Sequence, residues 1–144
     1  MKISASVTNG NDKHRVVLRT GASEHSVTIP PKASGKGSSA NGGELLFLAF
    51  ATCYCNDIYR EAAKRAISVT NVEVNVQGEF GAEGDPAKNV TYGAKVTAHA
   101  GESDIQDLMK YVDTVAEIQN TVRRSVPVTL TRIEAIGEQK DRHE

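Results

Sequence analysis

Apolar and polar residues alternate in short runs near the start of the chain. These runs cover residues 3–7, 15–20 and 24–29, and turn-forming residues separate them. Alternation with a period of two is typical of half-buried strands. We therefore expect three strands here. The segment 30–43 is rich in Pro, Gly, Ser and Lys and is expected to be a mobile connecting loop.

A helix with clear start signals follows this loop. Asn41 is a suitable N-cap, and Glu44 occupies the capping-box position three residues later. We expect the helix to run from Leu45 to about Ala66. Its first half is apolar on nearly all sides, so that half is expected to be buried, whereas the charged second half should reach solvent.

The clearest strand pattern lies in the middle of the chain, where valines alternate with polar residues over 72–77. A turn over 81–89 and a second alternating run over 90–98 follow it. The pattern predicts a long antiparallel hairpin with one solvent-exposed face.

A second helix is predicted after this hairpin, with Ser103 as its cap and Gln106 at the capping-box position. Its single apolar stripe extends to Val122. A final strand is predicted over 126–130, and the charged residues 137–144 are expected to form a flexible tail.

The predicted order of elements is β-β-β-α-β-β-α-β, with strands grouped in hairpins. This order indicates an α+β fold with a mostly antiparallel sheet on which both helices pack. The 144 residues fit a single domain that spans the whole chain.

Composition and charge exclude several classes of function. The net charge is −1 and tryptophan is absent, so we expect no binding to nucleic acid or to anionic lipid. The longest apolar run, 45–51, is too short to cross a membrane. The first residues do not resemble a secretory signal, which makes a cytoplasmic location the expectation.

Candidate chemistry centres on Cys53. The only other cysteine is Cys55, and we expect both to be free thiols in a reducing compartment. A cysteine in an apolar helix is often a small core residue. Here, however, the polar residues Asn56, Asp57 and Arg60 follow Cys53 on roughly its own face. A nearby cation would favour the reactive thiolate, so a nucleophilic role is a second interpretation.

Metal and nucleotide sites find no support in the sequence. The Cys-x-Cys pair and the scattered histidines lack the spacing of a zinc site. The glycines of the connecting loop match neither nucleotide-binding fingerprint. We therefore expect no cofactor and no metal.

The stretch from Asn41 to Cys53 resembles a motif of the OsmC/Ohr family, which reads approximately Asn-Pro-Glu-Glu/Gln-Leu, an Ala-rich turn and Ala-Ala/Ser-Cys. The spacing from Asn to Cys is the same. Residues 62–67 and 72–76 also look like the family, and 126–129 (Val-Pro-Val-Thr) is similar to its second motif, Cys-Pro-Val/Tyr-Ser. The resemblance covers essentially the whole chain.

The resemblance implies an intertwined homodimer with active sites at the subunit interface. In this family a first cysteine attacks an organic hydroperoxide or peroxide and becomes a sulfenic acid. A second cysteine resolves it as a disulfide, and an external dithiol restores the enzyme. An arginine near the N-terminus and a glutamate at the helix start support the thiolate.

Only part of this machinery carries over to the present chain. Cys53 matches the attacking cysteine, whereas Val126 stands in place of the resolving cysteine. The supporting glutamate falls on Gly43, with Glu44 at the next position.

The supporting arginine falls near Asn11, with Arg15 or Arg19 as substitutes. Cys55 has no family counterpart.

Three functions therefore remain, in order of preference. The first is peroxide reduction at Cys53, resolved by an external thiol or by Cys55. The second is a non-catalytic module that binds a small apolar ligand at the dimer interface. The third is a different thiol-dependent reaction at the same site.

Overall fold

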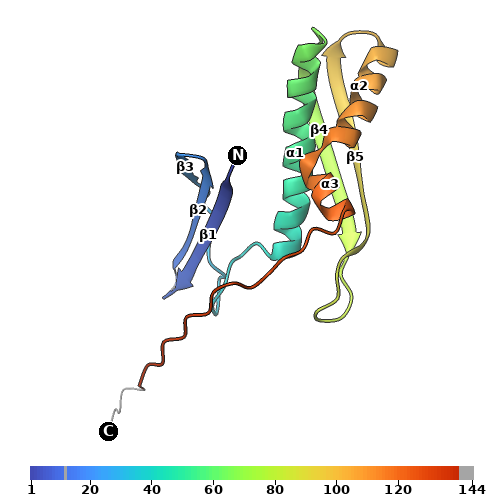
Figure 1. The fold of residues 1–144 in the computed structure, drawn as a ribbon. Helices are drawn as coiled ribbons and strands as arrows, with labels where there is room; N and C mark the ends of the chain where they lie inside the picture. Colours follow the sequence, from blue (N-terminus) through green and yellow to red (C-terminus); the bar gives the residue numbers. More distant parts are fainter. Residues whose placement is uncertain (12, 140–144) are drawn as a thin grey trace.

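The computed structural model describes residues 1–11 and 13–139. Within these residues the chain forms two antiparallel sheets and three helices (Figure 1). The elements are, in order, β1 (Ile3–Gly10), β2 (Lys13–Thr20), β3 (Ser23–Ser26), α1 (Gly42–Lys64), β4 (Ser68–Glu79), β5 (Lys88–His99), α2 (Glu102–Val115) and α3 (Glu117–Arg123). The expected α+β class with hairpin-grouped strands is confirmed. The expected single sheet is divided into two, and part of the expected tail, 140–144, lies outside the described residues.

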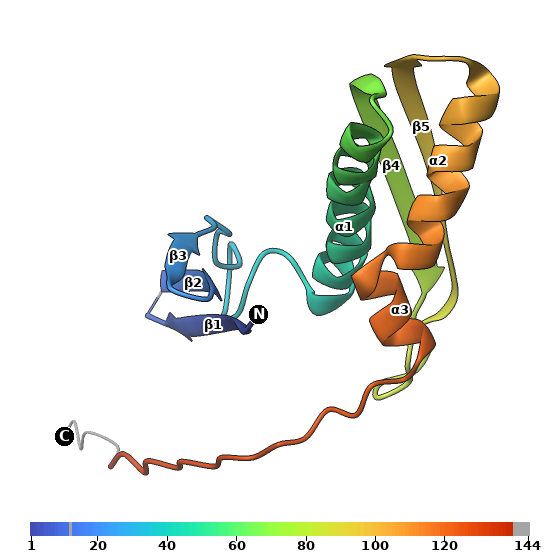
Figure 2. The same ribbon diagram turned by 45° about the horizontal axis from the view of Figure 1, so that its top comes forward.

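The first sheet has the order β1-β2-β3, as the alternating runs predicted. Figures 1 and 2 show it standing apart from the helices, joined to them by the connecting loop. Its apolar side chains are poorly covered: Ile3 is 64% exposed and Val7 is 62% exposed. The side chain of Asn9 hydrogen-bonds to the backbone of Gly37, which ties the loop to this sheet.

The second sheet is the β4–β5 hairpin, on which α1 and α2 pack (Figure 2). The buried core is formed by residues of the two helices, namely Tyr54, Ile58, Ala62, Leu108 and Val112. The alternating valines of β4 contribute their inner face to this core, so the predicted strand and its one exposed face are confirmed. Burial of these side chains, at about 25 cal/mol per Å² of apolar area, provides the main driving force for this part of the fold.

The start of α1 follows the sequence prediction. The side chain of Asn41 accepts a hydrogen bond from the backbone of Glu44, and the side chain of Glu44 accepts one from the backbone of Asn41. The capping box is therefore confirmed, and the helix ends at Lys64, two residues before the expected end.

The predicted burial of α1 is wrong within this chain. Its buried residues lie in the middle and second half, namely Phe50, Tyr54, Asp57, Ile58, Glu61 and Ala62. In the first half, Leu48 is 59% exposed and Leu45 is 37% exposed. The reason is that α2 and the hairpin cover the later turns, whereas one side of the first turns lacks a partner among the described residues.

The second helix also departs from prediction. It begins at Glu102 with Gly101 as its N-cap, so Ser103 is not the cap. Glu102 and Asp104 in the first turn favour this start because they carry negative charge at the positive end of the helix.

The expected continuous helix is broken at Ala116, whose backbone is extended (φ −68°, ψ 105°). The hydroxyl of Thr114 donates to the backbone carbonyl of Tyr111. The side-chain amide of Asn120 donates to the backbone carbonyl of Thr114. These bonds satisfy backbone groups that a continuous helix would use, and they stabilise the break.

The predicted final strand is absent from the described part of the chain. Residues 126–130 have no strand partner there, and Val128 is 98% exposed. A strand needs a neighbouring strand to satisfy its backbone, and the described residues offer none at that position. No helix among the described residues is both long and apolar enough to span a membrane.

Candidate functional site

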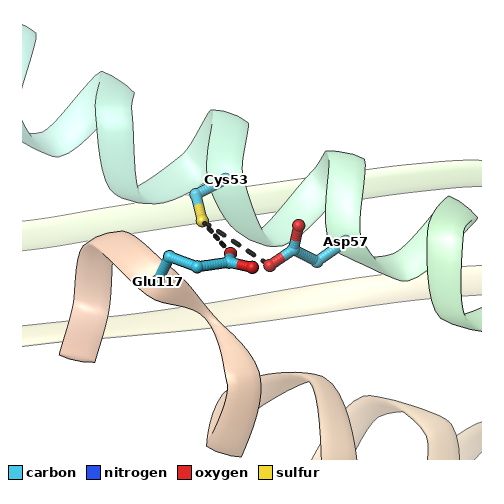
Figure 3. Close-up of side chains that lie close together, drawn as sticks. All are labelled: Cys53, Asp57 and Glu117. Atoms are coloured by element: carbon cyan, nitrogen blue, oxygen red, sulfur yellow. Dashed lines mark hydrogen bonds between the residues drawn. The ribbon is translucent and has the colours of Figure 1, made fainter. Parts of the chain in front are cut away.

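Cys53 lies in the middle of α1, on the side that faces α3 (Figure 3). Its thiol is 3.6 Å from Oδ2 of Asp57 and 3.7 Å from Oε2 of Glu117, both within reach of a weak S–H donor. Asp57 is four residues further along the helix and therefore one turn away on the same face. Glu117 reaches the thiol because α3 begins directly after the break at Ala116.

Arg60 holds both carboxylates from the other side. Its Nη1 lies 3.0 Å from Oδ1 of Asp57 and 3.0 Å from Oε1 of Glu117. The guanidinium therefore binds one oxygen of each carboxylate, and the other oxygen of each faces the sulfur of Cys53. We call these four residues the thiol–carboxylate cluster.

The electrostatics of this cluster disfavour the thiolate. Burial raises the pKa of the Cys53 thiol, and the negative charges of Asp57 and Glu117 raise it further, opposed by the backbone of Ile118. Burial, followed by hydrogen bonding and repulsion from Glu117, raises the pKa of Asp57 to about 6, although Arg60 opposes this. At neutral pH the thiol is thus protonated beside carboxylates that act as acceptors.

Glu117 shows the opposite behaviour. A hydrogen bond from its own backbone lowers its pKa most, burial opposes this, and Asp57 and Arg60 lower the pKa further. When the pair takes up one proton, that proton resides on Asp57, and Glu117 keeps its charge. The two carboxylates therefore form a coupled pair with distinct roles.

A metal ion has one geometrically suitable place here. One ligand atom from each of Cys53, Asp57 and Glu117 lies within 4.8 Å of the others. Arg60 already supplies positive charge to both carboxylates. A guanidinium in that position would repel a cation, so we assign no metal to the cluster.

Cys55 lies elsewhere on α1. It is half-buried and unpaired with Cys53, and it lines an open cleft of about 250 Å³ between α1 and β4. The other lining residues are Ala51, Thr52, Asn56, Val72 and Val74. The two thiols therefore face different surroundings.

The structure does not bring the remaining predicted residues to Cys53 within this chain. Glu44 caps α1. Arg15 and Arg19 lie on β2, in the sheet that stands apart from α1 (Figure 2). Arg19 pairs with Glu24 at 2.7 Å.

Gly43 occupies the position at which the resemblance placed a supporting glutamate. A Cβ atom built on Gly43 would lie 2.7 Å from Cε2 of Phe80, and that ring stacks on Phe47 with centroids 6.0 Å apart. A larger residue here would require the aromatic pair to move. The site of the family's carboxylate is thus filled by apolar packing.

Nothing in the sequence pattern indicated Glu117. It is separated from Cys53 by 64 positions and reaches the thiol only through the packing of α3 on α1. Asp57 and Arg60 were expected near Cys53 because helical spacing places them there. The helix break that positions Glu117 has only the β-branched pair Thr114 and Val115 as a local signal.

Comparison with known proteins identifies the family. The family model described as "OsmC-like protein" matches residues 35–131, and this chain belongs to that family. No curated protein sequence matches the chain significantly.

Several solved structures share the fold. An OsmC-like protein from Mycoplasma pneumoniae is 17% identical, with 85% of this chain and 86% of that chain covered and a TM-score of 0.58. A hypothetical protein from Aquifex aeolicus VF5 is 17% identical, with 87% and 89% covered and a TM-score of 0.59. An organic hydroperoxide resistance protein, OsmC, from Legionella pneumophila is 20% identical, with 85% and 90% covered and a TM-score of 0.50.

Proposed function

We propose that this protein reduces organic hydroperoxides with Cys53 as the attacking thiol. The main supporting observation is the position of that thiol on α1, where it donates to two acceptors held by one arginine. Membership of the OsmC-like family supports the same reaction class. One protein of similar fold carries the name organic hydroperoxide resistance protein, which agrees with this proposal.

The second half of the reaction requires an external thiol. Val126 stands where the resemblance places a resolving cysteine, and Cys55 is the only other cysteine of the chain. Cys53 and Cys55 are two residues apart on a continuous helix, so their side chains point about 200° apart. An oxidised Cys53 must therefore wait for a small thiol, which favours a reducing, cytoplasmic setting and exposes the sulfur to over-oxidation.

We also propose that the working form is a homodimer. Apolar side chains remain uncovered on the first sheet, on the first half of α1 and after α3. The most exposed of them are Ile3, Val7, Leu48, Val128, Leu130, Ile133 and Ile136. A second copy would bury these surfaces, and it would bring further groups, including Arg15 or Arg19 of its own first sheet, to the site.

The test is consumption of cumene hydroperoxide with dithiothreitol as reductant. We expect the wild type to consume peroxide and Cys53→Ser to lose this activity. Cys55→Ser makes the same chemical change two residues away and should retain it. Equal consumption by the wild type and Cys53→Ser would contradict the proposal.

The raised pKa of Cys53 favours a second candidate, a non-catalytic module that binds a small apolar ligand. A buried thiol with a raised pKa carries little thiolate at neutral pH, which lowers its reactivity. The pH dependence of iodoacetamide alkylation, measured in Cys55→Ser, separates the two candidates. A midpoint above the ordinary value of 9.0 together with no peroxide consumption would favour the binding module.

A further inference from the structure

The thiol–carboxylate cluster places two proton acceptors within hydrogen-bonding distance of the sulfur. The S–H group of Cys53 is aimed at Oδ2 of Asp57 and Oε2 of Glu117 (Figure 3). The oxygens that face Arg60 are the other two, Oδ1 and Oε1. Each carboxylate therefore has one oxygen fixed by the guanidinium and one oxygen available for the thiol proton.

We propose that Asp57, paired with Glu117, takes the proton of Cys53 as the sulfur attacks a hydroperoxide and returns it to the leaving oxygen. Arg60 is a positioning residue that holds the two carboxylates. This inference rests on the proposed function, and it assigns to these residues the role of taking up and returning the thiol proton.

The sulfur of Cys53 attacks the terminal oxygen of ROOH, an S–O bond forms and the O–O bond breaks. The thiol is oxidised by two electrons to the sulfenic acid, and the peroxide is reduced to the alcohol ROH. The S–H proton passes to Asp57 and then to the leaving alkoxide oxygen. Two equivalents of an external thiol then reduce the sulfenic acid, releasing water and one disulfide.

Burial and charge in the cluster suit this transfer. Asp57 is 5% exposed, so its carboxylate has little water to compete with the thiol, whereas the side chain of Glu117 is 62% exposed. Among the described residues, the charged groups that act on Asp57 are Arg60 from α1 and Glu117 from α3, and Glu61 contacts Arg60. A carboxyl group whose pKa lies near 6 can both accept and release a proton close to neutral pH.

Two rates measured on the same variants test this role. Alkylation by iodoacetamide releases iodide, which needs no proton, so its rate reports the fraction of thiolate. Peroxide reduction releases an alkoxide, which does need one. Asp57→Asn and Glu117→Gln each remove a negative charge beside the sulfur, and Asp107→Asn makes the same change as Asp57→Asn on an exposed position of α2.

We expect the two rates to move in opposite directions. Alkylation at pH 7 should become several-fold faster in Asp57→Asn and Glu117→Gln, because the thiol pKa falls when a neighbouring charge is removed. Peroxide reduction should become slower by about tenfold or more, because proton transfer by a positioned group contributes about 10² or more to a rate. Asp107→Asn should match the wild type in both assays.

Several outcomes would overturn the assignment. If both rates rise in Asp57→Asn and Glu117→Gln, the carboxylates only suppress the thiolate. If neither rate changes, they do not act on the sulfur. Glu117 is largely exposed, so Glu117→Gln provides the answer if Asp57→Asn fails to fold. If the wild type consumes no more peroxide than Cys53→Ser, the proposed function itself fails and this role fails with it.

The pH profile of peroxide reduction tests the positioning role of Arg60. Arg60→Lys keeps the charge, whereas Arg60→Gln removes it and leaves Asp57 next to Glu117 without a counter-charge. We expect the pH profile of peroxide reduction to shift upward in Arg60→Gln, because the pKa of Asp57 rises further, and Arg60→Lys to restore most of the wild-type profile. An unshifted profile in Arg60→Gln would contradict the positioning role.

Discussion

The carboxylate of Asp57 lies 3.6 Å from the thiol of Cys53, one turn earlier on the same helix. Asp57 is also almost fully buried, at 5% exposure. Its charge is costly there, and the pKa of the group rises to about 6. The protonation of Asp57 therefore affects both the stability of the fold and the reactivity of the Cys53 thiol.

We predict that Asp57→Asn is relatively more stabilising at pH 7 than at pH 4. In the wild type the pKa of Asp57 rises from 3.8 to about 6 on folding, so the folded form binds the proton more tightly than the unfolded chain. The stability that this group contributes is complete below pH 3.8 and is lost as the pH rises through about 6. Asn does not titrate and suffers no such loss.

The difference in the free energy of unfolding between Asp57→Asn and the wild type should grow by at most about 3 kcal/mol over this range. The lowered pKa of Glu117 opposes the trend and reduces its size. Urea unfolding at about pH 4, 5, 6 and 7 measures this difference in the free energy of unfolding. Asp107→Asn is the matched control. A difference that stays constant with pH would contradict the raised pKa of Asp57.

Local signals in the sequence predicted the parts of this fold that depend on neighbouring residues. The capping box of Asn41 and Glu44 is such a signal, because both hydrogen bonds join residues three positions apart. The alternation of valines in β4 is another, since a period of two fixes which side chains face α1. In the same way, the spacing of residues along a helix predicted that Asp57 and Arg60 lie near Cys53.

Features that depend on distant partners were not predicted. Glu117 contacts Cys53 only because α3 turns back after Ala116, and no spacing along the chain encodes that contact. The predicted burial of the first half of α1 and the predicted strand over 126–130 were wrong for the same reason. Both segments carry apolar side chains that would be buried only against another surface. The described residues of this chain do not provide that surface.

We predict that Tyr92→Phe destabilises the fold by about 2 kcal/mol. The hydroxyl of Tyr92 on β5 donates to Asp113 on α2, and Asp113 also pairs with Arg123 of α3 at 2.6 Å. The substitution removes a hydrogen bond to a charged group and one of the connections between the hairpin and α2. Thermal unfolding measures the loss. Tyr59→Phe, at a ring that is 46% exposed, should change the stability by less than about 0.5 kcal/mol.

We predict that mild oxidation does not join Cys53 to Cys55. Both residues lie within the continuous helix α1, and a bridge between them would require that helix to unwind locally. The expected product is a sulfenic acid at Cys53, or a mixed disulfide when a small thiol is present. Mass spectrometry after treatment with one equivalent of peroxide identifies it. A rapid and complete loss of two hydrogens from the peptide that contains both cysteines would show that the bridge forms.

We predict that a second subunit covers the exposed apolar half of α1. Leu48 is 59% exposed in the single chain, so Leu48→Glu costs the isolated subunit little. In the proposed homodimer the same change would bury a charge at the interface, which is strongly unfavourable without a paired cation. We expect sedimentation velocity at micromolar concentration to give a dimer for the wild type and a monomer for Leu48→Glu. Ala63→Glu introduces the same charge at an exposed position near the other end of α1 and should remain dimeric. A wild type that sediments as a monomer would refute the proposed dimer, and an unchanged Leu48→Glu dimer would place the interface away from this face of α1.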